Sequence, residues 1–402
     1  MKELPKEVEI VVIGGGVFGC SLAYHLARKK REVILLEAKN LAWGASGRNG
    51  GQVIQLEGRD KNLETIKLRL EITQYNNLRL GSLEEELGVN MEYKKIGSLD
   101  IALTDEEWED LKKTVKAQRE AGDKEIELLD KKEVLRICPL LTSQVKGGRF
   151  RPSDGVINPF FYTHAFAWKV EELGGEVFTH TPVRRILEEG RKVKGVEIEG
   201  GKKIKANIVV NATNAWATSL TPSIQIIPLR QVAVVTEPFS PLPVFPMEAF
   251  IEGEAIFTTT QTESGNLVVG GFRSQERTLS GQFDLRVDIE ELRGSTTILE
   301  RLFPEISFLS IIRSWSGVMA TTGDFLPAIG KVPDKEGLFI SAGFYNGMAY
   351  ATAVGELLAE YILTGKEPSL LKPFSPQRLY RKRWRVPDKY NVTTLVKFFE
   401  RA

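Results

Sequence analysis

Cysteine and histidine are scarce in this chain. Its 402 residues include two cysteines, Cys20 and Cys138, and three histidines, His25, His164 and His180. Two widely separated cysteines exclude a disulfide framework and a cysteine-rich metal centre. The isolated histidines show no ligand spacing. We therefore predict no metal site, and we expect the histidines to be structural and not catalytic.

Strong net charge and long apolar runs are also lacking. The formal net charge of +1 gives no global field toward nucleic acid or an anionic membrane, so we expect neither as a partner. The opening MKELPKEVEI lacks the apolar core of a signal peptide, and no run is long enough to span a bilayer. We expect a cytoplasmic protein. Its length and its 42% hydrophobic content allow two packed domains.

The most informative stretch is a glycine turn between two apolar runs. Val8–Ile13 predicts a strand, which stops at the sequence GGGVFG of residues 14–19. A helix is predicted to about Lys30, and a second strand, Val33–Leu36, ends on an acid. The order of strand, glycine turn, helix, strand and acid predicts dinucleotide binding. The alternative is a glycine turn that only packs.

Three glycines and the acid have distinct expected roles. Gly14 permits the tight turn, and Gly16 lets the backbone approach a pyrophosphate. Gly19 lets the helix pack closely on the strand. The N–H groups and positive potential at the helix N-terminus favour phosphates. Glu37 is placed where a carboxylate can accept hydrogen bonds from a ribose diol.

A second small-residue segment, ASGRNGG at residues 45–51, distinguishes between the dinucleotides. A nicotinamide-binding unit usually continues from the acid into another strand and helix. Here the chain enters a loop whose backbone N–H groups can reach a flat ring or a second phosphate. A flexible surface loop is the alternative.

The rest of the chain is divided by composition and period. Residues 60–136 are charged and helical in period, and residues 160–173 predict a helix. Residues 193–198 and 203–208 predict a hairpin, and the buried strand at 208–212 ends at a candidate ligand edge. Residues 225–310 are β-rich, which predicts a separate sheet. The tail from Gln377 is basic, and we expect it to pack on the body or on a partner.

The C-terminal third carries two further signals. Residues 315–330 read WSGVMATTGDFLPAIG before the last strand. Gly343–Met348 reads GFYNGM and leads into a long helix that we predict from about Met348 to Leu363. The Asn346–Gly347 turn can open that helix toward a ligand, where its N-terminus would stabilise negative charge on a reduced flavin. An ordinary strand-to-helix turn is the alternative.

Together these segments resemble the FAD-dependent D-amino acid oxidase family. Residues 44–52 are most similar to γ-glutamylputrescine oxidase, residues 343–348 to glycine oxidase, and residues 315–330 to sarcosine oxidase and the β subunit of dye-linked proline dehydrogenase. The resemblance implies an α/β plus α+β fold. A discontinuous Rossmann-like FAD-binding domain (1–85, 147–222 and 311–366) would pack on a β-sheet substrate domain (86–146 and 223–310), followed by a basic tail (367–402).

The resemblance also implies the residues that line the cofactor. The expected cofactor-binding residues are Gly14, Gly16, Val17, Phe18, Gly19, Glu37, Ala38, Ala45, Ser46, Arg48, Asn49, Gly50, Gly51, Gln52, Val183, Ala212, Gly317, Gly343, Asn346, Gly347 and Met348. Family members with covalent flavin attach it through a histidine or cysteine near the glycine loop or the C-terminal turn. Neither place has one here, so we expect non-covalent FAD.

Substrate recognition departs from the family pattern at one position. Met319 stands where many members place an arginine for the substrate carboxylate. A carboxylate in a dry pocket needs a cation, and Arg230, Arg273 and Arg313 are available. We predict Arg230 for this role, and we place Tyr345 and Met319 beside it on the substrate side.

The resemblance implies hydride transfer from the carbon beside nitrogen to flavin N5, which gives an imine. We predict oxidation of a glycine-, sarcosine- or proline-like amino or imino acid. The alternatives are an amine such as a γ-glutamyl-polyamine, a nicotinamide-dependent dehydrogenase, and a flavin-bearing relay or structural subunit. Oxygen or another acceptor would take the electrons, and oligomers or further subunits are left open.

Overall fold

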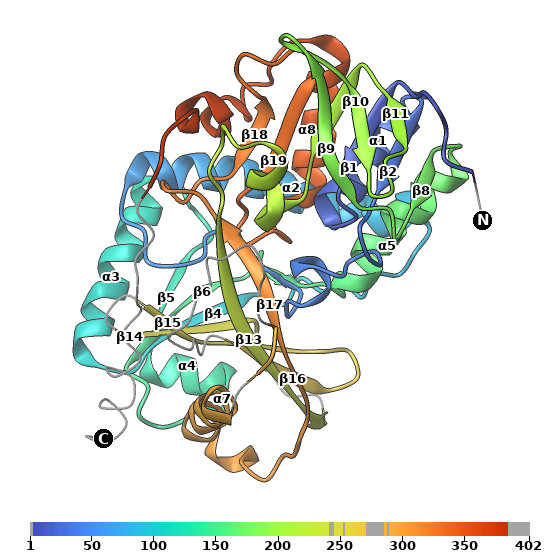
Figure 1. Cartoon of the computed structure of the whole chain (residues 1–402). Helices are drawn as coiled ribbons and strands as arrows, with labels where there is room; N and C mark the ends of the chain where they lie inside the picture. Colours follow the sequence, from blue (N-terminus) through green and yellow to red (C-terminus); the bar gives the residue numbers. More distant parts are fainter. Residues whose placement is uncertain (1–2, 241–244, 252–253, 271–284, 288, 385–402) are drawn as a thin grey trace.

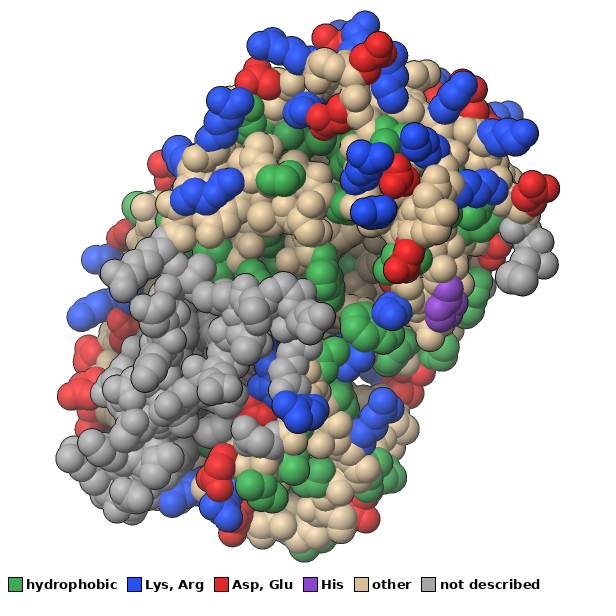
Figure 2. Space-filling model, viewed as in Figure 1, with side chains coloured by type: hydrophobic (Ala, Val, Ile, Leu, Met, Phe, Trp, Pro, Cys, Tyr) green, Lys and Arg blue, Asp and Glu red, His purple; other side chains and the backbone are tan. Residues whose placement is uncertain are grey.

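The chain forms two sheet layers joined by long strands (Figure 1). In this computed structural model the described residues are 3–240, 245–251, 254–270, 285–287 and 289–384. The upper layer in Figure 1 contains a six-stranded sheet, and the lower layer contains an eight-stranded sheet. Charged side chains of both signs are scattered over the visible face (Figure 2), as the near-neutral net charge leads one to expect. Within the described part of the chain, no helix is both long enough and apolar enough to cross a membrane.

The six-stranded sheet is the expected nucleotide-binding layer. Its spatial order is β18 (Ala328–Lys331), β19 (Leu338–Ala342), β12 (Ile208–Asn211), β1 (Ile10–Ile13), β2 (Val33–Leu36) and β8 (Glu176–Phe178). All neighbours are parallel except β18, which pairs antiparallel at the edge. Most residues of these strands are apolar, as expected for a sheet that is covered on both faces.

Helices and a small sheet cover the two faces of this layer. One face packs against α1 (Val17–Arg28), α5 (Pro159–Glu172) and α8 (Ala351–Thr364), with α2 (Leu63–Leu87) outside α8. The other face packs against the antiparallel sheet of β9 (Val183–Glu189), β10 (Lys192–Ile198) and β11 (Lys203–Lys205).

The eight-stranded sheet is assembled from four separate stretches of chain. Its spatial order is β17 (Ile311–Thr321), β13 (Ile227–Pro238), β16 (Asn266–Gly270), β15 (Glu254–Gln261), β14 (Met247–Ile251), β4 (Ser98–Ala102), β6 (Gly147–Arg151) and β5 (Glu127–Asp130). One face packs against α4 (Lys131–Ile137) and α7 (Ile289–Leu302). The remaining elements are β3 (Gln52–Val53), β7 (Gly155–Val156), α3 (Asp105–Glu120), α6 (Ala217–Leu220) and short 3₁₀ turns at Ala45–Gly47, Asn214–Trp216, Pro304–Ile306, Lys372–Phe374 and Pro376–Leu379.

Local chemistry explains where several helices begin and end. Side-chain oxygens of Asn62, Thr104, Asp130 and Asn158 accept hydrogen bonds from first-turn N–H groups of α2, α3, α4 and α5. α2 ends at Gly88, whose φ of 68° lies in the left-handed region that glycine adopts without strain.

The structure corrects parts of the expected division. The helical stretch 60–136 also contributes β4 and β5, and the β-rich stretch 225–310 contains α7. The expected boundaries at 147 and 311 place β6 and β17 in the nucleotide-binding domain, but both strands belong to the eight-stranded sheet. Strand partners far away in sequence decide this membership. The basic tail is described only to Trp384, so its last 18 residues lie outside the described chain.

Candidate active site

One elongated cavity of about 910 Å³ lies between the two sheets. Its volume is near the upper end for small-molecule sites, which suits a ligand as large as a dinucleotide. Sequence-predicted residues that line it are Gly14, Gly16, Val17, Phe18, Glu37, Ala38, Ala45, Ser46, Arg48, Asn49, Gly50, Gln52, Val183, Ala212, Gly317, Met319, Tyr345, Asn346, Gly347 and Met348. The structure thus brings together segments that span most of the chain.

The glycine turn lies between β1 and α1, as predicted. Gly14 has a φ of 111°, and a side chain there would meet the backbone of Ala212 at 2.7 Å. Gly19 does not line the cavity, because it faces the turn and a Cβ atom would overlap the carbonyl oxygen of Gly14. Among the first-turn residues of α1 there is no acid, so its N-terminus keeps a positive potential. The backbone N–H of Val17 donates to Ser46 Oγ at 3.0 Å.

Glu37 follows β2 and is held by the backbone. Its Oε2 accepts from the N–H of Gly15 at 2.6 Å, and its Oε1 accepts from the N–H of Lys39 at 2.7 Å. The carboxylate lines the cavity beside the glycine turn. This is the geometry in which a carboxylate can also accept hydrogen bonds from a ribose.

The loop after β2 is ordered by its own polar side chains. Asn49 Nδ2 donates to the carbonyl of Ala45 at 2.8 Å, and Asn49 Oδ1 accepts from the N–H of Gly51 at 2.8 Å. Gly51 itself does not line the cavity; its φ is 74°, and a Cβ atom would overlap the carbonyl oxygen of Ile157. The loop is therefore a shaped wall and not a flexible surface segment.

Two side chains tie this loop to the eight-stranded sheet. Gln52 Nε2 donates to the carbonyl of Thr259 at 2.9 Å. Arg48 donates to the carbonyls of Trp43 and Ser316, each at 2.9 Å, and its stem lies against Gly317. Burial lowers the pKa of the Arg48 guanidinium, and the nearby charge of Arg313 lowers it further.

The turn after β19 differs from the sequence-based expectation. α8 begins at Ala351 and not at Met348. Its first N–H groups are already engaged, because Asn76 Oδ1 accepts from Thr352 at 3.0 Å and from Ala353 at 3.2 Å. The expected helix terminus aimed at a ligand is therefore not formed, although Asn346, Gly347 and Met348 line the cavity.

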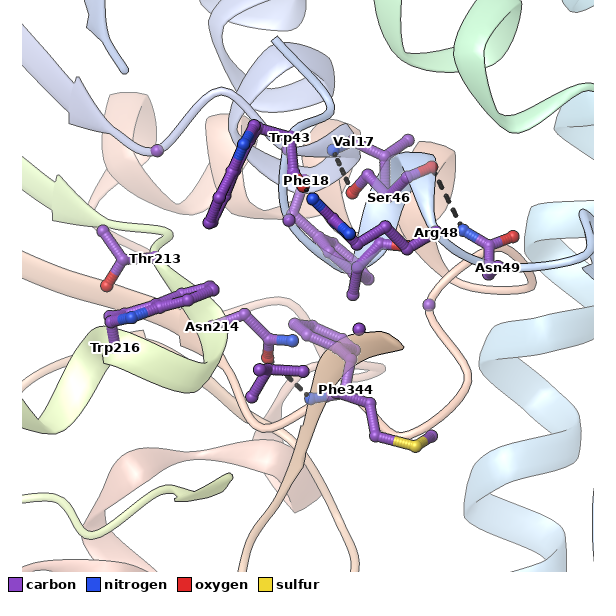
Figure 3. Close-up of a pocket in the computed structure, with 18 of the residues that line it drawn as sticks. Val17, Phe18, Trp43, Ser46, Arg48, Asn49, Thr213, Asn214, Trp216 and Phe344 are labelled. Carbon is purple, nitrogen blue, oxygen red and sulfur yellow. Dashed lines mark hydrogen bonds between the residues drawn. The ribbon is translucent and has the colours of Figure 1, made fainter. Parts of the chain in front are cut away.

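Asn214 shapes this turn from a strand end that sequence reasoning noted only as a ligand edge. Its Oδ1 accepts from the N–H groups of Gly343 and Phe344 at 2.8 and 3.1 Å (Figure 3). Gly343 lies behind the wall with a φ of 84°. The ring of Phe344 stacks on that of Phe18, with centroids 3.6 Å apart.

Arg230 does not line the cavity. The next residues of β13, Gln231, Val232 and Ala233, do line it, as does Val318, the cross-strand partner of Arg230 on β17. The Arg230 guanidinium instead pairs with the buried Glu291 of α7 through both carboxylate oxygens and also reaches the carbonyl of Arg286. The predicted carboxylate-binding role is therefore not supported by its position. Arg273 lies outside the described residues, and Arg313 does not line the cavity.

Sequence reasoning missed several lining residues. Trp43 and Trp216 flank one side of the cavity, with ring centroids 6.3 Å apart (Figure 3). The segment after β12 could have signalled Trp216. Other missed wall residues lie on the eight-stranded sheet or beside it, among them Gln231, Val232, Ala233, Thr258, Thr260, Val268, Gly270, Val318 and Glu57. No local motif marks them, because their strands meet only in the folded sheet.

Comparison with known proteins identifies the family. Residues 9–361 match the family model described as FAD dependent oxidoreductase. The chain belongs to this family. The resemblance noted in the sequence is thereby confirmed, as are the FAD cofactor and the oxidoreductase class.

Relatives of this FAD-dependent oxidoreductase carry several activities in their names. Glycine oxidase of Geobacillus kaustophilus is 26% identical, with 92% of this chain and 97% of that protein covered. L-Proline dehydrogenase from P. horikoshii has a solved structure that is 32% identical, with a TM-score of 0.84 over 95% of this chain and 100% of that one. Dimethylglycine dehydrogenase of Rattus norvegicus is 26% identical, but the match covers 94% of this chain and only 45% of that protein.

Proposed function

We propose that this enzyme oxidises the C–N bond of a small amino or imino acid, such as glycine, sarcosine or proline, with non-covalently bound FAD. One observation carries the proposal: a single cavity runs from the β1–α1 glycine turn to the inner face of the eight-stranded sheet. A dinucleotide at the turn therefore presents its far end to that sheet. The named activities of the relatives support the substrate class.

The residues present fit FAD. Gly14, Gly16 and the first N–H groups of α1 would hold the pyrophosphate, with Ser46 beside them. Glu37 would bind the ribose. Trp43 and Trp216 offer flat surfaces along the cavity. Among the described lining residues there is no histidine or cysteine, which supports a non-covalent cofactor.

When bound, FAD supplies the ring nitrogen N5, which accepts a hydride from the carbon beside the substrate nitrogen. The protein's part is to hold that carbon in place and to exclude water. Gly50 and Gly317 line the cavity without side chains that would fill it. Tyr345 and Met319 would border the substrate from the C-terminal turn and from β17.

The proposal has two forms, an amino acid substrate and an amine without a carboxylate. Only the amino acid needs a cation in the cavity to pair with its carboxylate. Arg230 is occupied by Glu291, whereas Arg48 lines the cavity and donates to two carbonyl oxygens. An amino acid substrate would place its carboxylate toward Arg48. Met319 in the sheet wall favours the alternative, an amine without a carboxylate such as a γ-glutamyl-polyamine. A relay or structural subunit remains the second alternative, and cytoplasmic residence is part of the proposal.

A substrate panel tests the function. Purified protein should be yellow, and acid precipitation should release FAD into the supernatant. Under anaerobic conditions, glycine, sarcosine or L-proline should bleach the flavin absorbance. Adding oxygen or a dye afterwards identifies the acceptor. A flavin that stays oxidised with every amino acid and amine would contradict the proposal, and flavin retained in the pellet would contradict non-covalent binding.

A further inference from the structure

A row of residues crosses the eight-stranded sheet on the face that lines the cavity. The register places Thr258 opposite Gly270 on one side and opposite Glu248 on the other. Thr258 and Gly270 both line the cavity. Residues paired directly across neighbouring strands share a face of the sheet. Glu248 therefore lies on the cavity face, one strand beyond the cavity wall.

The same row continues into buried charge. Glu248 pairs in register with Asp100 on β4, and Asp100 pairs with Arg149 on β6. The guanidinium of Arg59 donates hydrogen bonds of 2.9 and 3.0 Å to the two carboxylate oxygens of Asp100. The guanidinium of Arg149 lies 3.5 Å from Asp100 Oδ2. Glu248 is only 1% exposed, and neither of its oxygens accepts an N–H or O–H hydrogen bond from the described residues. Both arginines therefore contact Asp100, and neither donates a hydrogen bond to Glu248.

Glu57 connects Glu248 to the cavity. It lies between β3 and α2, it lines the cavity, and its carbonyl accepts from Arg69 at 3.2 Å. The buried guanidinium of Arg69 also attracts the Glu57 carboxylate, so the charge of this acid is partly balanced. Burial raises the pKa of the Glu248 carboxyl well above its ordinary value, and the charges of Glu57 and Asp100 raise it further, against the opposing charge of Arg149. Oε2 of Glu57 and both carboxyl oxygens of Glu248 are buried, and the two side chains interact with each other. Two carboxyl groups can share a hydrogen bond only when one of them carries a proton.

We propose that Glu57 and Glu248 share one proton, and that the remaining negative charge binds the ammonium group of the substrate and accepts its proton. The inference rests on the C–N oxidation proposed above. In the transfer, an N–H bond of the ammonium breaks and an O–H bond forms on Glu57. The nitrogen keeps the electron pair, which it needs before the neighbouring C–H bond can be broken.

The other described residues that line the cavity on the side of the eight-stranded sheet offer no acid to bind the substrate ammonium. Gln231 and Thr260 are neutral, and the Oγ1 of Thr260 is buried at the cavity without a hydrogen-bond partner among the described residues. The other charged lining residues are Glu37 and Lys39, beside the glycine turn, and Arg48. Glu57 is therefore the described acid on the substrate side, and the site selects a substrate that arrives as a cationic amine.

The test separates charge recognition from shape. Glu57→Gln keeps size and removes the charge, and Asp110→Asn is a matched control at the outer end of the same charged cluster, where Asp110 contacts Lys61 at 2.7 Å. Dissociation constants are measured from the flavin absorbance for sarcosine and L-proline. They are also measured for methoxyacetate and tetrahydrofuran-2-carboxylate, in which oxygen replaces the nitrogen.

Glu57→Gln should weaken binding of the amino acids about thirtyfold or more and leave the oxygen analogues within about twofold. FAD content should match wild type, and Asp110→Asn should change neither set. Equal loss for both sets would show that Glu57 only shapes the site, and no loss would refute ammonium binding. If no amine reduces the wild-type flavin, the proposed function fails and this inference fails with it. If amines reduce wild type and Glu57→Gln alike, the inference alone fails.

The shared proton has its own signature. The infrared difference between wild type and Glu248→Gln at neutral pH should contain the C=O stretch of a protonated carboxyl group, shifted in D₂O. Glu248→Gln still donates a hydrogen bond to Glu57, so its affinity for the amino acids should stay within about threefold of wild type. A difference spectrum without the protonated carboxyl band would refute proton sharing.

Discussion

The two sheets contribute to the cavity in different ways. On the six-stranded side, the glycines and small residues of the turn and the loop lie among larger side chains such as Phe18 and Trp43, and most of the lining residues fall within residues 14–52. On the eight-stranded side, they are side chains of Gln231, Thr258, Thr260 and Met319, from three strands. A site built from backbone needs glycines in a short order, so its residues are local. A site built from side chains needs only the right register, so its residues can come from anywhere in the chain.

Buried charge also differs between the two regions. On the nucleotide side, Glu37 is held by backbone N–H groups. In the eight-stranded layer, acids are held by arginines, with Arg230 on Glu291 and Arg59 on Asp100. A buried ion pair is costly to break, because the remaining charge has no solvent. Substitutions in the eight-stranded layer should therefore mainly reduce stability, and substitutions on the nucleotide side should mainly reduce FAD binding.

The largest expected effect is on stability in the eight-stranded layer. Arg230→Met removes the guanidinium that pairs with the buried carboxylate of Glu291 and should lower the free energy of unfolding by about 3–5 kcal/mol. Denaturant unfolding measures this loss. The double variant Arg230→Met/Glu291→Leu should recover most of it and should bind substrate as wild type does. A single variant that stays stable but loses only amino acid binding would restore the carboxylate role of Arg230.

A glycine substitution should act on the nucleotide side. Gly19→Ala places a Cβ atom against the carbonyl oxygen of Gly14, so it should cost about 1–3 kcal/mol of stability and reduce FAD content. Gly81→Ala is the matched control, because Gly81 lies in α2 with nothing within 4 Å of the added atom. The control should gain about 0.5–1 kcal/mol. Equal behaviour of the two variants, by thermal unfolding and flavin absorbance, would contradict the close approach.

Glu37→Gln tests the nucleotide side, because it removes the charge of this side chain and keeps its size. Loss of the charge should weaken a hydrogen bond to a ribose by about 1–2 kcal/mol, which corresponds to roughly tenfold in FAD affinity. The substrate constants of the FAD-saturated variant should be unchanged. Titration of apoprotein with FAD measures the affinity, and an unaltered value would place Glu37 away from the ribose.

The smallest expected effect concerns acid stability of the nucleotide side. Burial in α1 lowers the pKa of His25 to about 3, against the charge of Glu86. The unfolded chain binds a proton near pH 6.5 while the folded chain does not, so stability falls as pH falls below 6.5. His25→Leu should remove about 1 kcal/mol of the loss between pH 6 and pH 5. Denaturant unfolding at both pH values checks this, and an unchanged slope would be the contrary result.

Much of the nucleotide side could be predicted from the sequence. The strands at 10–13, 33–36 and 208–211, the Gly14 turn and the position of Glu37 all agree with the structure. The predicted start of α8 at Met348 was three residues too early, because a turn at Gly347–Tyr350 precedes the helix. Local patterns do not reveal that Asn76 of α2 supplies the bonds at that helix terminus.

On the substrate side, less of the structure could be predicted from the sequence. Arg230 was predicted to face the substrate because it enters the sheet, but its guanidinium pairs with the buried Glu291 of α7. β6 and β17 join the eight-stranded sheet through partners that are distant in sequence. The alternation of one strand does not say which face will be covered by a helix and which will line a cavity.

The sequence by itself determined the FAD-dependent family, the glycine turn, the acid after β2 and the loop at 45–52, since each is a short-range requirement on backbone shape. Only the tertiary structure decided which side chains of the eight-stranded sheet face the cavity, and that Glu57 reaches the buried Glu248. The physical reason is that register and burial arise from pairing between strands far apart in the chain. No local pattern encodes which acids end up buried together.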